Sequence, residues 1–354
     1  ATPISIMVGV GKAAEYGVLI RHGDALQRAG QITTVVLDKT GTVTAGEPVV
    51  TNLVVSDGWD EATLLTLAAS IETGSEHPLA EAVVAAAEER GLSLSQVEAF
   101  EAIAGRGVQA QLDGQPLLFG NRGLMDDHHI DLAELPGEAA RLAANGETPM
   151  FLAIAGSAAG IVAVADPIKP DSKEAIARLH AIGIKVVMLT GDNAATAAAV
   201  AQQVGIDEVI AEVLPADKSA RVAALQKKGE VVGMVGDGIN DAPALARADV
   251  GFAIGTGTDV AIESADVTLM RGSLHGVADA ISISTATVRN IKQNLFGAFI
   301  YNSLGIPIAA GILFPLFGIL LNPIVAGGAM AMSSLTVVSN ANRLRFFKPS
   351  GAQS

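Results

Sequence analysis

The sequence contains no cysteine, only one tryptophan and two tyrosines, and few charged residues, 17% of its 354. The absence of cysteine excludes a disulfide-stapled secreted module and any zinc or iron–sulfur site with thiolate ligands. Basic residues are also scarce, since 23 Lys and Arg stand against 37 Asp and Glu, a net charge of −14. This balance argues against nucleic acid as a partner. The length is sufficient for about two domains with real cores.

One long segment lacks charge altogether. No Asp, Glu, Lys, Arg or His occurs between Lys292 and Arg343, a stretch about twice the roughly 20 residues that one membrane span needs. We expect two transmembrane helices over 293–342 and a cytoplasmic tail over 343–354; a buried hairpin in a soluble domain is the alternative, which the uninterrupted length disfavours. Basic residues flank the segment on both sides, which places the folded domains in the cytoplasm. The sequence predicts a multi-pass protein of the cell membrane, with the lipid bilayer as a partner.

Strand and helix patterns alternate on both sides of a differently built middle region. Short β-branched runs end at Asp38 and recur, separated by helical patterns, over 185–189, 209–213, 231–235 and 250–254. Such alternation predicts a doubly wound parallel sheet, in which ligands bind beyond the carboxyl ends of the strands. We expect this α/β domain over two stretches of chain, residues 21–45 and 166–292.

The middle region, residues 46–165, has an α+β pattern and predicts an inserted second domain. Two helical patterns, Glu61–Thr73 and Pro78–Arg90, are followed by hairpin-like runs. One hairpin joins the run Val97–Leu112 to Pro116–Gly120 through an Asp-Gly turn. At the other end of the chain, residues 1–20 are expected to be the cytoplasmic end of a truncated membrane helix.

Acidic residues follow three of the predicted strands: Asp38, Asp192, and Asp237 with Asp241. Carboxylates gathered in one crevice repel each other unless a hard cation neutralises them, and Mg²⁺ bound by carboxylates and phosphate oxygens meets that need. Glycines and helix starts beside them, as at Gly191, supply backbone N–H groups for a phosphoryl group. A carboxylate can also be the covalent acceptor in phosphoryl transfer. Each Asp alone would more often be a helix cap, but three at the strand ends of one sheet favour a phosphate site.

Three motifs, Asp-Lys-Thr-Gly-Thr at 38–42, Thr-Gly-Asp-Asn at 190–193 and Gly-Asp-Gly-Ile-Asn-Asp at 236–241, occur in this order around the insertion. The combination resembles the phosphorylation domain of a P-type ATPase, with a haloacid-dehalogenase-like fold. The resemblance implies that Asp38 is phosphorylated and that the hinge back from the insertion lies at Asp166-Pro167. It implies the catalytic residues Asp38, Lys39, Thr40, Thr190, Gly191, Asp192 and Lys218, and the Mg²⁺ ligands Asp38, Thr40, Asp237 and Asp241.

The position two residues after Asp38 separates two kinds of enzyme in this superfamily. Soluble phosphatases carry a second Asp there, which protonates the leaving group, and this chain has Thr40. ADP leaves without such an acid, and an aspartyl phosphate without a neighbouring base survives longer. A persistent phosphoenzyme suits a pump, and a membrane-tethered phosphatase is the alternative.

The insertion resembles the nucleotide-binding domain of heavy-metal-transporting P-type ATPases. The motifs are Ser-Glu-His-Pro-Leu at 75–79, Gly-Arg-Gly at 105–107 and Gly-Asn-Arg at 120–122. The resemblance implies that Glu76 and His77 contact adenine and that ATP lies near Gly105, Gly107 and Asn121. His77 taken alone would more often be a residue of a helix start.

Polar residues within the charge-free segment are candidates for function, because such groups are costly in a membrane. Tyr301 and Asn302 in the first predicted span, and Met330 and Ser334 in the second, are similar to the pattern of Cu⁺ and Ag⁺ exporters. A thioether is a soft ligand suited to Cu(I), whereas the zinc and cadmium branch places a Lys and an Asp in these helices. The resemblance implies ATP-driven export of Cu⁺, with Ag⁺ as the other candidate ion.

Parts of the family's pattern are not found in this sequence. It has no Cys-Pro-Cys motif and no Thr-Gly-Glu of the actuator domain. We expect the chain to be the C-terminal catalytic part of a pump, incapable of transport alone, with the N-terminal half and a copper chaperone as candidate partners. A nucleotide-binding regulatory subunit of a pump is a further alternative.

Overall fold

The computed structural model describes residues 2–75, 77–255, 257–312, 314–318 and 322–351. The chain divides into two compact units. The first comprises residues 1–38, 171–187 and 215–354, and the second comprises residues 39–170 and 188–214. The limits of these units differ from those of the domains predicted from the sequence. The predicted domain limits stay a prediction.

Seven strands form one sheet in the order β1-β13-β12-β11-β2-β9-β10. β2, β11, β12 and β13 pair in parallel, and β1 lies antiparallel at the edge. The strands are β1 Val18–Ile20, β2 Thr34–Asp38, β9 Lys185–Leu189, β10 Glu208–Ile210, β11 Val232–Gly236, β12 Val250–Ile254 and β13 Val267–Leu269.

β2 occupies the point where the strand order reverses, because the later strands continue on both of its sides. β2, β11 and β12 are buried along their whole length, which explains why they are continuous apolar runs rather than alternating ones. The predicted α/β sheet is confirmed. In such a sheet the crevice at the switch point, beyond the carboxyl ends of the strands, is the place for a ligand.

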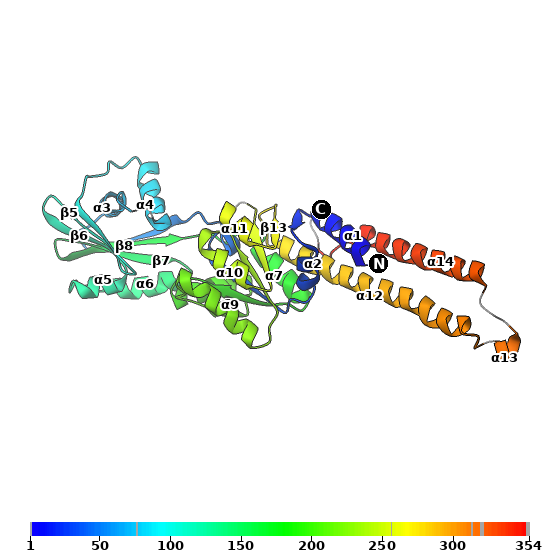
Figure 1. Cartoon of the computed structure of the whole chain (residues 1–354). Helices are drawn as coiled ribbons and strands as arrows, with labels where there is room; N and C mark the ends of the chain where they lie inside the picture. Colours follow the sequence, from blue (N-terminus) through cyan, green and yellow to red (C-terminus); the bar gives the residue numbers. More distant parts are fainter. Residues whose placement is uncertain (1, 76, 256, 313, 319–321, 352–354) are drawn as a thin grey trace. The chain divides into compact units, whose positions relative to one another are not determined.

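The helices of the first unit precede, connect or follow these strands. They are α1 Thr2–Glu15, α2 Gly23–Ala29, α7 Ser172–Ala181, α9 Lys218–Lys227, α10 Ala242–Arg247, α11 Asp259–Ser264, α12 His275–Ala309, α13 Phe314–Phe317 and α14 Pro323–Asn342. The long helices α12 and α14 run side by side, joined through α13 at the end away from α1 (Figure 1).

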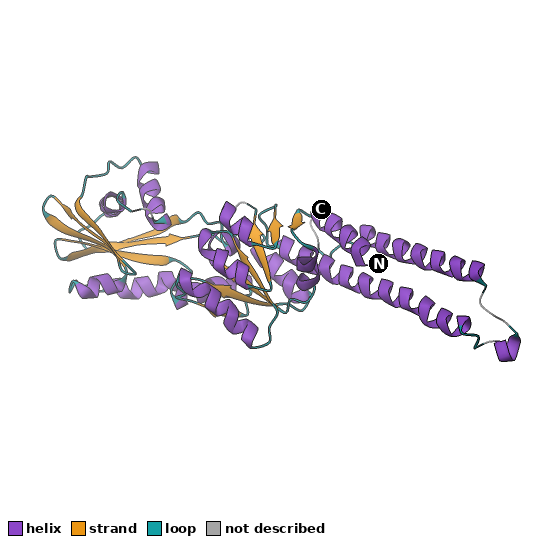
Figure 2. Cartoon of the chain, viewed as in Figure 1, coloured by secondary structure: helices purple, strands orange, loops and turns teal. Residues whose placement is uncertain are grey.

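The second unit contains a six-stranded antiparallel sheet in the order β3-β8-β7-β6-β5-β4. Figure 2 draws the strands in orange and the helices in purple. Its strands are β3 Val49–Val55, β4 Glu98–Ile103, β5 Gly107–Leu112, β6 Gln115–Gly120, β7 Thr148–Ile154 and β8 Ser157–Ala165. The run Val97–Leu112, expected as one arm of a hairpin, is two strands. The chain turns at Gly105, where φ is +70°, a backbone conformation that glycine adopts without strain.

Helices cover both faces of this sheet. One apolar cluster joins it to α3 Glu61–Glu72 and α4 Pro78–Glu89, and a second joins it to α5 Arg122–Asp127 and α6 Leu135–Ala144. The unit also contains α8 Ala194–Val204. The helices expected at 61–73 and 78–90 are therefore present, each ending one residue earlier than predicted.

Of the two predicted membrane spans, the second is supported by length and composition. Residues 323–346, α14 and the turn after it, are long and apolar enough to cross a membrane, and only 11% of the most apolar window is buried in the protein. Within the described ranges no other helix passes the same test. The first predicted span falls in the C-terminal part of α12, which ends at Ala309, and it stays a prediction.

Candidate active site

Two neighbouring strands bring the first acidic residues together. Leu37 of β2 pairs with Val235 of β11, so the residues that follow them emerge beside each other at the carboxyl edge of the sheet. These are Asp38 and, past Gly236, Asp237. One carboxylate oxygen from each of Asp38, Asp237 and Asp241 lies within 4.8 Å of the others. Three of the four predicted Mg²⁺ ligands therefore lie at one place.

Lys218, the first residue of α9, contributes a cation between two of these acids. Its Nζ donates to Oδ1 of Asp38 at 2.6 Å and to Oδ1 of Asp241 at 2.7 Å, and all three side chains are buried. Burial and the adjacent Asp241 raise the pKa of Asp38 to about 7, against the opposing effect of Lys218. Burial acts to lower the pKa of Lys218, but Asp38 and Asp241 hold it above its usual value. The site therefore contains more negative charge than one ammonium group balances.

The donor set of this cluster fits a hard divalent cation. Carboxylate oxygens are what Mg²⁺ prefers, usually one or two of them together with phosphate oxygens. The backbone also leaves room, since a Cβ at Gly236 would lie 2.6 Å from the Cβ of Asp241. Only glycine permits this approach. When bound, Mg²⁺ would neutralise phosphate oxygens and lower the pKa of Asp38, favouring the ionised carboxylate.

In the second unit, Lys39 and the segment 190–192 form another charged group. Lys39 makes a half-buried ion pair with Asp192, and the N–H of Asp192 donates to Oγ1 of Thr190 at 3.1 Å. Thr40 is exposed on the turn after Lys39. A Cβ at Gly191 would lie 3.6 Å from the carbonyl oxygen of Val213, an ordinary van der Waals distance.

The turn after Asp38 is held by the segment that returns from the insertion. Asp166 accepts hydrogen bonds from Oγ1 of Thr44 and from the N–H of Gly46, and Lys169 donates to the carbonyl of Gly41 at 2.6 Å. Sequence analysis placed Asp166 at the hinge but did not foresee these bonds. The outgoing and returning segments lie side by side here, which fixes the base of the insertion.

His77 caps α4. Its Nδ1 accepts the N–H of Leu79 at 3.2 Å, and its ring is exposed. The preceding turn packs on β4, since a Cβ at Gly74 would lie 2.9 Å from the ring of Phe100. Glu76, the other predicted adenine contact, lies outside the described residues.

The glycines and the amide of the predicted ATP site form one local structure. Gly107 has φ +142°, and a Cβ there would lie 2.3 Å from the carbonyl oxygen of Phe119. Asn121 caps α5 by accepting the N–H of Leu124 at 3.1 Å and donates to the carbonyl of Gly105 at 2.8 Å. These three motif residues are therefore adjacent. Gly107 is also required by the close approach of β5 to β6.

Glu72, at the end of α3, was missed by the sequence analysis. Burial raises the pKa of this carboxyl to about 7, opposed by a hydrogen bond with Ser75. Its Oε2 is buried without a partner among the described residues. Glu72 lies three residues before the Ser-Glu-His-Pro-Leu motif. Its residue type alone does not single it out, because it becomes unusual only through its burial in the folded unit.

The predicted copper ligands lie on α12 and α14. Asn302 donates to the carbonyl of Ala298 at 3.1 Å, and Ser334 donates to that of Met330 at 3.1 Å. Met330 is 70% exposed and Tyr301 37%. Both of these hydrogen bonds therefore stay within the helix of the side chain that donates them.

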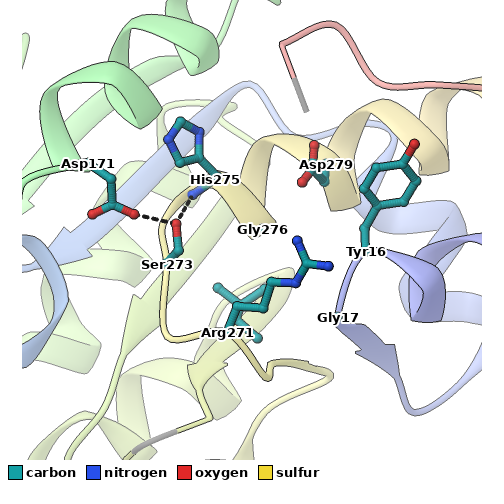
Figure 3. A pocket seen from close by; sticks show the side chains of 9 residues that line it. Tyr16, Gly17, Asp171, Arg271, Ser273, His275, Gly276 and Asp279 are labelled. Carbon is teal, nitrogen blue, oxygen red and sulfur yellow. Dashed lines mark hydrogen bonds between the residues drawn. The ribbon is translucent and has the colours of Figure 1, made fainter. Parts of the chain in front are cut away.

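A cavity of about 200 Å³ lies in the first unit and is lined by Tyr16, Arg271, His275 and Asp279 among others (Figure 3). Ser273 donates to Asp171 at 2.5 Å and accepts the N–H of His275. Arg178 bonds Asp279 at 2.7 Å, the Nδ1 of His275 at 2.9 Å and the carbonyl of Ser350. These hydrogen bonds link α7, α12 and the C-terminal residues. The polar side chains around the cavity therefore serve to hold these elements together.

The parallel sheet, with acids beyond its switch strand, defines a doubly wound α/β protein. The chain belongs to the haloacid dehalogenase-like hydrolase family, whose model matches residues 32–249.

Similarity to individual proteins identifies the family more narrowly. The chain is 54% identical over 349 residues to a copper-transporting ATPase 2 of Rhizobium meliloti, covering 99% of this chain and 42% of that protein. It is 52% identical over 348 residues to a copper-exporting P-type ATPase of Bacillus subtilis, covering 98% and 42%. The resemblance to P-type ATPases of the copper-exporting branch is confirmed.

Solved structures of P-type ATPases also match the chain. A zinc-transporting PIB-type ATPase in the E2.Pi state superposes with a TM-score of 0.75 at 38% identity, covering 97% of this chain and 55% of that one. The catalytic domain of the CPx-ATPase CopB-B matches with a TM-score of 0.60 at 28% identity, covering 77% and 98%. The chain spans less than half the length of the curated relatives described above.

Proposed function

We propose that this chain is the catalytic C-terminal part of a pump that exports monovalent copper at the expense of ATP, through an aspartyl phosphate on Asp38. The observation that carries the proposal is the group of buried Asp38, Asp241 and Lys218 with half-buried Asp237 at the switch point of the sheet. The alternatives are a membrane-tethered phosphatase and a regulatory subunit of a pump.

The proposed reaction is an in-line transfer. An oxygen of Asp38 attacks the γ-phosphorus of ATP, the bond from that phosphorus to the β–γ bridging oxygen breaks, and ADP leaves with the electron pair. Lys218 stabilises the negative charge of the transferring group, and Thr190 and the backbone at Gly191 donate to its oxygens. Asp237 and Asp241, with Asp38 and Thr40, would hold Mg²⁺. Water later hydrolyses the aspartyl phosphate.

The second unit is proposed to hold the nucleotide. His77 would stack on adenine, Glu76 would accept from its amino group, and the backbone at Gly105, Gly107 and Asn121 would lie along the nucleotide. The ion pair of Lys39 with Asp192 would keep the charged loop of 190–192 in place. The domain limits predicted from the sequence belong to this proposal.

The transported ion is proposed to be Cu⁺, with Tyr301, Asn302, Met330 and Ser334 among its ligands. The names of the relatives support copper, and the soft thioether of Met330 supports a monovalent soft ion. Ag⁺ shares this chemistry. The proposed partners of the chain are the lipid bilayer, the N-terminal half of the pump and a copper chaperone.

Phosphorylation of Asp38 tests the catalytic proposal. The chain in lipid nanodiscs is incubated with Mg²⁺ and γ-labelled ATP, and we expect an acid-stable, hydroxylamine-sensitive label that Asp38→Asn abolishes. Asp217→Asn, an exposed acid just before α9, is the matched control and keeps the label. Equal labelling of Asp38→Asn and the parent chain would refute the assignment, and rapid turnover of small phosphomonoesters without nucleotide would favour the phosphatase. ATP binding without labelling would favour the regulatory subunit.

A further inference from the structure

Four polar side chains join three helices in a buried cluster. Ser5 lies on α1, Asn290 and Asn294 lie one turn apart on α12, and Asn340 lies on α14. Ser5, Asn290 and Asn294 are at most 5% exposed. We call this group the amide cluster.

The hydrogen bonds of the amide cluster form a closed network. Oδ1 of Asn290 accepts from Oγ of Ser5 at 2.8 Å and from Nδ2 of Asn294 at 3.1 Å, and Nδ2 of Asn294 also donates to Oγ of Ser5 at 3.0 Å. Nδ2 of Asn290 donates to the carbonyl of Asn340 at 2.8 Å, and Nδ2 of Asn340 donates to Oδ1 of Asn294 at 2.9 Å. Each bond depends on a particular donor facing a particular acceptor, so the network exists at one axial register of the helices.

The packing beside the amide cluster is close between α1 and α12, whereas α12 and α14 carry exposed apolar side chains farther along. A Cβ at Gly9 of α1 would lie 2.5 Å from Oγ1 of Thr287, so α1 and α12 are in tight contact. Beyond the cluster, α12 and α14 present exposed apolar side chains such as Leu304 and Leu335. Apolar contacts between helices are not directional, whereas buried hydrogen bonds specify register.

We infer that the amide cluster fixes the axial register of α12 against α14 and so acts as a set of positioning residues for the transported ion. The link to the ion rests on the proposed function, but the register itself does not.

The depth of the predicted ligands follows from this register. The helices are antiparallel and both extend from the amide cluster in the same direction (Figure 1). At about 1.5 Å per residue, Asn302 lies about 12 Å from Asn294 along α12, and Ser334 and Met330 lie about 9 and about 15 Å from Asn340 along α14. Asn302 therefore falls between Ser334 and Met330 in depth. A slip of one turn, about 5.4 Å, in either direction moves it outside that interval.

A distance measurement between spin labels tests the inference without ATP or copper. The chain has no cysteine, so Leu304→Cys and Leu335→Cys, at side chains 63% and 59% exposed, give two labels in nanodiscs with no background. We expect one distance population in this background. Asn294→Leu, which keeps the side-chain size, and Asn340→Ala are expected to add a second population displaced by up to about 5 Å. Ser339→Ala, at an exposed neighbour of Asn340 on the same helix, keeps a single population.

The outcomes separate register from stability. A single unchanged population in both variants, with or without a lower melting temperature, overturns the inference, because the cluster would then stabilise the helices without positioning them. If Asn294→Leu does not fold, Asn340→Ala decides, since it keeps the main-chain carbonyl that Asn290 uses. A failure of ATP labelling at Asp38 leaves this result unaffected, so the two proposals fail independently.

Discussion

The ammonium nitrogen of Lys218 lies 2.6 Å from Oδ1 of Asp38, and both groups are buried. The same nitrogen bonds Asp241, so one cation holds two carboxylates that would otherwise repel each other. This arrangement explains how the site exists before any nucleotide binds, and it makes the site sensitive to any cation that competes with the ammonium group.

Replacement of Lys218 is therefore expected to make the fold depend on Mg²⁺. Lys218→Met leaves buried carboxylates without their cation, and breaking such a pair costs about 3–5 kcal/mol. We expect the variant to melt at a lower temperature than the parent chain without metal, with part of the loss restored by millimolar Mg²⁺. Thermal unfolding with and without Mg²⁺ measures both effects. Lys228→Met, at an exposed residue after the same helix, serves as control, and an equal response of the two variants to Mg²⁺ would contradict the account.

Glu72 is expected to destabilise the second unit at neutral and higher pH. Burial raises its pKa in the folded state to about 7, from a usual value of 4.5. The folded state therefore retains a proton that the unfolded chain has already released, so the free energy of unfolding falls as pH rises from 4.5 to about 7 and is lowest above that. Glu72→Gln should raise the stability at pH 8 by roughly 2 kcal/mol and by less at pH 5.5.

Urea unfolding of Glu72→Gln and its parent at several pH values tests this sign. Glu89→Gln, at an exposed residue of α4, should leave the pH dependence as it is. A stabilisation by Glu72→Gln that is equal at pH 5.5 and pH 8 would exclude titration of Glu72 as the cause.

The acidic strand ends could be predicted from the sequence, whereas Glu72 and the amide cluster could not. The strands that end at Asp38 and before Asp237 were predictable, because buried parallel strands are short continuous apolar runs and the acids follow them directly. Glu72 was not predictable, since an acid in an otherwise ordinary helix becomes unusual only when its helix packs on a sheet. The partners Ser5 and Asn290 are separated by 285 positions. No local pattern connects residues that far apart, so the amide cluster emerges only in three dimensions.

The break between β4 and β5 is another feature that the sequence alone did not predict. The segment Val97–Leu112 carries a strand-like composition throughout, so one strand was expected. The structure turns at Gly105 and pairs Ile103 with Gly107. The two glycines are compatible with a turn and equally with a nucleotide-binding loop, and the sequence alone favoured the second interpretation.

Two substitutions at His77 separate its role as a helix cap from the proposed role in binding adenine. His77→Ala removes the acceptor for the N–H of Leu79 and should cost about 1 kcal/mol of stability. His77→Asn provides a good capping side chain but no ring. We expect both variants to bind ATP about tenfold more weakly, a loss of about 1.4 kcal/mol, and only His77→Ala to melt at a lower temperature. Calorimetric titration with ATP and thermal unfolding measure these quantities, and full ATP affinity in His77→Asn would show that the ring does not contact the nucleotide.

Thr40 is expected to control the lifetime of the phosphorylated state. The side chain is exposed on the turn two residues after Asp38, where a carboxylate could activate water for attack on the aspartyl phosphate. Thr40→Asp should keep the ability to be labelled by ATP but lose the label more than tenfold faster in a chase with unlabelled ATP. General base catalysis contributes about 10²–10⁴-fold in rate, so even an imperfectly placed carboxylate should be detectable. Thr40→Asn has nearly the same shape and no basic oxygen, and it should retain the parent lifetime. If Thr40→Asp and Thr40→Asn shorten the lifetime equally, the cause is the loss of the threonine rather than a gain of base, which would contradict this account.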